Sequence, residues 1–169
     1  MDVAQAVPVV NNMKQTKKIV MSAVIAAIYA VLTMTLYVIS YGPVQLRFSE
    51  ALTILPVFTP AAIPGLTVGC IIANILGGYG VLDVVIGSLA TLLAAICTRL
   101  FRKNTFLALF SPVFFNSLLV GPMLYFVVPE SKSLLFNVLT VGIGELVACF
   151  AAGYPLMRLL KKYPKLFEI

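Results

Sequence analysis

The sequence predicts an all-α membrane protein with six transmembrane helices, the second of them short or broken. Composition is the first reason, because 61% of the 169 residues are hydrophobic and only 11% are charged, unlike an average soluble domain. Length is the second, since it allows about six spans of roughly 20 residues with short connections. The third is that the basic residues gather beside the apolar segments, where they determine topology.

The first apolar segment follows a basic region. Residues 14–18 are basic and precede an unbroken apolar run at 19–39, which we interpret as a retained helix because it is long and lacks a convincing cleavage site. We expect residues 1–16 to form a flexible N-terminal tail and residues 17–169 to form one six-helix transmembrane domain.

The second apolar segment, 49–59, is too short to cross a bilayer upright. Pro43 ends the helix before it, because proline interrupts a helix and biases the preceding residue away from one. Pro56 and Pro60 bound the segment itself. We therefore expect a short or broken helix whose start is capped by Ser49.

Four further apolar segments complete the chain. A glycine-rich turn at 77–80 separates the third segment from the fourth, and a basic loop separates the fourth from the fifth. A polar hairpin precedes the last segment. The predicted spans are 61–76, 84–100, 105–128 and 134–160.

The basic residues support this topology. With a cytoplasmic N-terminus and six crossings, the clusters at 14–18, 99–103 and 158–165 all lie inside, together with the C-terminus. They hold ten of the twelve lysines and arginines, leaving Arg47 and Lys132 outside. This distribution follows the positive-inside bias of membrane proteins, which also explains the net charge of +6 without a nucleic acid partner.

Several function classes are disfavoured. Histidine is absent and the three cysteines lie far apart, so we expect neither a metal site nor a cofactor. The chain has no phosphate-binding loop of the form GxxxxGK[ST], so any coupling to ATP has to come from a partner. Without histidine or a nucleophile constellation, an enzyme acting on a lipid headgroup is the weakest hypothesis.

A few charged and amide side chains interrupt the apolar segments. Arg47 and Glu50 lie three residues apart between two apolar regions, and an ionisable group at membrane depth marks a functional site by default. The simpler interpretation is a loop ion pair, or an arginine that reaches the headgroups while Glu50 favours a helix N-terminus. For Asp83, too, the simpler interpretation is that its charge favours the N-terminus of a helix. We interpret Glu145, near the middle of the last span, as facing a cavity rather than forming a structural hydrogen bond between helices.

In this topology most of these side chains lie at the outer ends of their segments and converge at one membrane face. Carboxylates, amides, a guanidinium and tyrosine rings suit a small, planar, polar ligand, including a cationic one. The candidate substrate-binding residues are Arg47, Glu50, Asn74, Tyr79, Asp83, Asn137 and Glu145.

The run from Gln45 to Pro56, QLRFSEALTILP, resembles the queuosine-precursor transporter family of QueT type, as do the alanine-rich first helix and the six-span plan. The resemblance covers the chain from about Lys14 onward. It implies a substrate-binding S component of an energy-coupling factor (ECF) transporter in a prokaryotic plasma membrane. Such a protein takes up a 7-deazaguanine precursor of queuosine from outside the cell, and we expect the aminomethyl form preQ1.

The resemblance also implies partners, namely a transmembrane coupling subunit and two cytoplasmic ATPases. Ala23, Ala27 and Ala30 then form the docking surface for the coupling subunit, although spacing alone favours ordinary helix packing within the chain. Glu50, Asp83 and Glu145 are the candidate acids for the ligand, and which of them meets the ring or the amine is left open.

Two alternatives remain. The protein could be a stand-alone ion-coupled carrier in which Glu145 titrates, or an S component for another vitamin. A carrier moves substrate by itself in liposomes with a proton gradient, whereas an S component binds alone and transports only with its partners and ATP.

Overall fold

The computed structural model describes residues 3–41, 46–77, 79–128 and 133–167, and every regular element within these ranges is a helix. The prediction of an all-α protein is therefore confirmed. The longer helices are α1 (Val3–Thr35), α3 (Ala62–Gly77), α4 (Ser88–Leu100), α5 (Thr105–Val127) and α6 (Leu134–Leu146). The shorter elements are α2 (Tyr37–Ser40), α7 (Tyr154–Leu160), the 3₁₀ helices η1 (Phe48–Val57) and η4 (Pro164–Phe167), and the π-helical turns η2 (Asp83–Gly87) and η3 (Val147–Gly153).

Several described segments are long and apolar enough to cross a membrane. They are Asn12–Thr35, Asp83–Leu100, Thr105–Val127 and Leu134–Leu160. The last three agree with the predicted spans to within one residue, because apolar runs bounded by polar turns are a strong helix signal. Elements η1 and α3 are apolar but shorter, so six full crossings stay a prediction.

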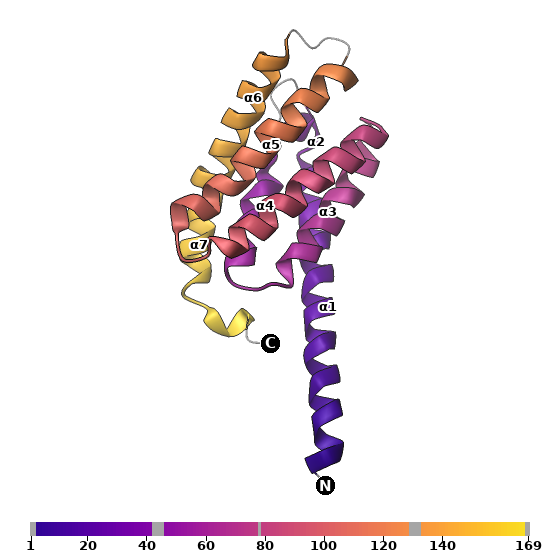
Figure 1. The fold of residues 1–169 in the computed structure, drawn as a ribbon, viewed down its shortest axis with the longest axis vertical. Helices are drawn as coiled ribbons and strands as arrows, with labels where there is room; N and C mark the ends of the chain where they lie inside the picture. Colours follow the sequence, from indigo (N-terminus) through magenta and orange to yellow (C-terminus); the bar gives the residue numbers. More distant parts are fainter. Residues whose placement is uncertain (1–2, 42–45, 78, 129–132, 168–169) are drawn as a thin grey trace.

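Helix α1 begins earlier than predicted. It runs without interruption from Val3, through residues for which the sequence predicts a flexible tail, and extends well beyond the other helices (Figure 1). The helix continues through Pro8 in its second turn, although proline usually interrupts a helix. At its other end the helix stops at Thr35, and the short helix α2 follows after Leu36.

Element η1 is the short second segment, as predicted. Its ten residues span about 20 Å at the ~2.0 Å rise of a 3₁₀ helix, less than the ~30 Å of a hydrocarbon core. The predicted cap was wrong, because the residue preceding the helix is Arg47 and its side chain makes no capping bond. The hydroxyl of Ser49 instead accepts a hydrogen bond of 2.7 Å from Thr33 on α1, which ties η1 to that helix.

The helices pack in sequence order around η1. Helix α1 packs on α3, α3 on α4, α4 on α5, and α5 on α6, while η1 contacts α1, α3, α4, α5, η3 and α7 (Figure 1). Gly69 permits the close approach of α3 to α1, because a Cβ atom there would lie only 2.8 Å from the carbonyl oxygen of Ala26. The second segment is thus held at the centre of the bundle.

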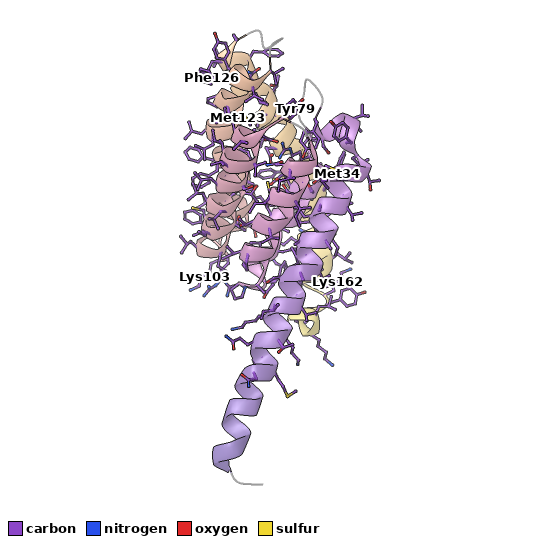
Figure 2. The ribbon with its side chains drawn as sticks, turned by 90° about the vertical axis from the view of Figure 1, so that its right-hand side faces the viewer. Met34, Tyr79, Lys103, Met123, Phe126 and Lys162 are labelled. Atoms are coloured by element: carbon purple, nitrogen blue, oxygen red, sulfur yellow. The ribbon has the colours of Figure 1, made fainter. Side chains whose placement is uncertain are left out.

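Both chain termini lie at the same end of the bundle (Figure 1). Figure 2 shows Lys103 and Lys162 toward that end, and Tyr79 and Phe126 toward the opposite one. This arrangement fits the predicted clustering of basic residues on one side. The cytoplasmic orientation of that side stays a prediction.

Candidate functional site

The centre of the bundle contains buried ionisable side chains. Arg47 and Glu50, at the start of η1, are only 6% and 1% exposed. Asp83 and Glu145 are also buried, so these four are the buried charged residues in the described part of the chain. Burying a charge is costly unless it is paired or hydrogen-bonded, and the contacts of these groups therefore define the site.

The first group, here called the arginine cluster, consists of Arg47, Tyr41, Asn74, Tyr79 and Asp83. Arg47 pairs with Asp83 at the start of η2, with 3.5 Å between Nη2 and Oδ1. Its Nη1 donates a 3.1 Å hydrogen bond to Oδ1 of Asn74, and the guanidinium lies 4.9 Å from the centre of the Tyr41 ring. Arg47 is therefore fixed between α3, η2 and an aromatic face.

Asn74 joins α3 to the start of the next span. Its amide nitrogen donates to the backbone carbonyl of Asp83 at 3.0 Å and contacts the Cys70 thiol at 3.4 Å. Gly87 provides the space for this amide, because a Cβ atom there would lie 2.6 Å from Nδ2. The side chain that orients Arg47 is thus itself held by backbone and glycine packing.

Two tyrosines cover this cluster. The Tyr41 hydroxyl donates to the carbonyl of Ala73 at 2.8 Å, and the Tyr79 hydroxyl donates to the carbonyl of Tyr41 at 2.6 Å. Their ring centres are 5.5 Å apart. Tyr79 lies between α3 and η2, in the upper half of the bundle (Figure 2), and burial raises the pKa of its phenol. These rings provide a surface on which a planar ligand could stack.

The second group, here called the glutamate cluster, consists of Glu50, Tyr29, Asn116, Glu145 and Cys149. The Tyr29 hydroxyl donates to Oε1 of Glu50. The Cys149 thiol lies 3.8 Å from the Glu50 carbonyl oxygen and 3.8 Å from Oε2 of Glu145. Asn116, in the middle of α5, lies beside both carboxylates. Residues from five elements, α1, η1, α5, α6 and η3, thus meet around two acids.

Both clusters contain polar atoms with unused hydrogen-bonding capacity. Within the described residues, Oε2 of Glu50, Nδ2 of Asn116 and Oδ2 of Asp83 accept or donate no hydrogen bond, and Oδ1 of Asp83 has only the 3.5 Å ion pair with Arg47. Buried polar atoms are nearly always paired, and each unpaired one costs about 1–3 kcal/mol. Such a set is expected where a polar ligand completes the network.

Most of the predicted residues come together in these clusters. Arg47, Asn74, Tyr79 and Asp83 lie in the arginine cluster, and Glu50 lies with Glu145 in the glutamate cluster. Asn137 is also buried, about two turns before Glu145 on α6, and the contacts above do not include it. On α1, Ala23 and Ala27 are exposed, whereas Ala30 is only 8% exposed and packs inside the chain.

Sequence reasoning missed Tyr29, Tyr41, Asn116 and Cys149. Asn116 had a signal, because an amide in the middle of an apolar span is itself a candidate functional group. Cysteine in an apolar run resembles a small buried hydrophobe, which hid the polar contacts of Cys149. The tyrosines carry no such signal, because their partners belong to other helices.

Comparison with known proteins agrees with this architecture. A family model described as "QueT transporter" matches residues 19–162. The chain is 32% identical over 161 residues to the curated "Queuosine precursor transporter QueT" of Lactococcus lactis subsp. cremoris (strain MG1363), and the alignment covers 88% of this chain and 95% of the relative. No solved structure matches. Because the family match spans most of the chain and includes both clusters, the protein is a multi-pass membrane protein that belongs to the QueT transporter family.

Proposed function

We propose that this protein is the substrate-binding S component of an ATP-driven ECF importer, and that it binds a queuosine precursor, preQ1 above all, from outside the cell. The observation that carries the proposal is a buried polar network, with unpaired donors and acceptors, inside a chain of the QueT transporter family. The Lactococcus relative is named for transport of a queuosine precursor, and we extend that substrate class to this chain.

The chemistry of the two clusters suits a 7-deazaguanine. The ring of such a molecule carries adjacent N–H donors and a carbonyl oxygen on its edge, and its faces are aromatic. The Asp83 carboxylate has unused acceptor capacity. Arg47 supplies a guanidinium group beside it, and Asn74 supplies an amide whose Nδ2 is a donor. The rings of Tyr41 and Tyr79 lie close by. Carboxylates accept hydrogen bonds from N–H groups, while amides and guanidinium groups donate hydrogen bonds to carbonyl oxygens.

The energy source in this proposal lies outside the chain. We propose that two cytoplasmic ATPases hydrolyse ATP and that a transmembrane coupling subunit links them to this chain, whose sequence contains no GxxxxGK[ST] motif. We propose that the coupling subunit docks on α1 at Ala23 and Ala27, which are exposed and spaced to allow close helix approach. Ala30 is buried within the bundle and borders this surface.

Reconstitution tests the proposal. The purified protein in liposomes should bind labelled preQ1 without accumulating it, and accumulation should require the coupling subunit, the ATPases and ATP. A catalytically inactive ATPase pair serves as the matched control. Accumulation by the protein alone under a proton gradient would contradict the S-component role and favour an ion-coupled carrier.

A further inference from the structure

The glutamate cluster holds an excess of negative charge. Of the buried charged residues described, one is basic and three are acidic. The ion pair of Arg47 with Asp83 accounts for one positive and one negative charge. The side chains that contact Glu50 and Glu145 are the neutral ones of Tyr29, Cys149 and Asn116. The charge of Arg47 also attracts both carboxylates, but one positive charge does not balance three negative ones.

Two carboxylates so placed repel each other when both are ionised, and burial strengthens that repulsion. A cation between them removes the repulsion and compensates part of the desolvation cost. Glu50 also provides an acceptor for a ligand, because its Oε2 atom is buried and receives no hydrogen bond from the described residues. An ammonium group, with three donors and one positive charge, matches this environment.

We propose that Glu50 and Glu145, with Asn116 beside them, bind the ammonium group of the ligand's aminomethyl arm, while the arginine cluster faces the ring. The assignment rests on the proposed function and states which acids meet which part of the ligand. Geometry permits it because Arg47 and Glu50 are three residues apart at the start of η1, so the two clusters are neighbours. The site then selects among deazaguanines by charge.

The test compares two ligands that share the ring and differ in the arm. The aminomethyl form carries the cation, and the cyano form is neutral. Calorimetry on the full protein in detergent should show the aminomethyl form binding about tenfold to a hundredfold more tightly, as expected for hydrogen bonds to a charged group. Glu145→Gln and Glu50→Gln, which keep the side-chain size, should each reduce this preference to about threefold or less, with little change for the cyano form.

Asp83→Asn is the contrasting variant. It removes the partner of Arg47, and we expect it to weaken both ligands by a similar factor and to leave their ratio unchanged. If Asp83→Asn abolishes the preference while Glu145→Gln retains it, the amine lies at Asp83 and the inference is wrong.

The ratio of the affinities of the wild-type protein for the two ligands tests the inference without any variant. The test therefore does not depend on whether a variant folds. Equal binding of both forms by the wild type would overturn the assignment and leave the proposed function standing. Binding of neither form, with another compound bound instead, would overturn the proposed function itself.

Discussion

Arg47 is the residue on which the arrangement of the site depends. It is 6% exposed and contacts an acid, an amide and an aromatic ring from three parts of the chain. A buried ion pair adds little stability over an apolar replacement, but removing one partner leaves an uncompensated charge. Its value here is therefore the specific geometry it imposes on α3 and η2.

The ion pair predicts that substitutions of Arg47 and Asp83 have non-additive effects on the free energy of unfolding. Asp83→Asn should lower the free energy of unfolding by about 3 kcal/mol, because it leaves Arg47 charged and without its acid. In the double variant Arg47→Met/Asp83→Asn, much of this loss should be recovered. Thermal unfolding in detergent measures both effects, with the exposed Lys162→Gln as control. Additive losses in the double variant would show that the pair does not matter.

At the scale of elements, sequence patterns predicted where the helices lie but not how their side chains meet. Spans at 84–100, 105–128 and 134–160 were found to within one residue, since apolar length and polar turns are local signals. The partnership of Arg47 with Asp83 and that of Glu50 with Tyr29 depend on packing between helices far apart in sequence, for which a single sequence carries no signal. Ser49 shows the same limit, because its bond to Thr33 replaced the local cap.

The contact between α3 and η2 depends on Gly87. A Cβ atom at this position would lie 2.6 Å from the Asn74 amide nitrogen, so Gly87→Ala should displace Asn74 from Arg47 and from the Asp83 carbonyl. We expect a loss of about 1–3 kcal/mol in unfolding free energy and weaker ligand binding, measured by thermal unfolding and calorimetry. Val85→Ala, on the exposed side of the same element, is the control. Unchanged binding in Gly87→Ala would mean that Asn74 does not organise the site.

In the whole molecule, ligand binding and docking of the coupling subunit involve different regions of the chain. The clusters lie inside the bundle, whereas Ala23 and Ala27 lie on the exposed face of α1. If that face docks the coupling subunit, the two activities can be lost independently.

Ala23→Leu/Ala27→Leu should therefore retain ligand affinity within about twofold but abolish ATP-driven uptake in the reconstituted complex, because bulky side chains prevent close helix approach. Ala151→Leu, at an exposed alanine of the last span, is the matched control and should transport normally. Normal uptake by the α1 variant would place the docking surface elsewhere.

The most direct test of the central claim is calorimetric binding of preQ1 to the purified protein, against guanine, riboflavin and thiamine. We predict tight, selective binding of preQ1 that is weakened in Glu145→Gln, because the buried clusters supply acids, donors and aromatic faces for that ligand. Binding of a vitamin in place of preQ1 would contradict the substrate assignment, and no binding of any of the four would contradict the binding-protein role.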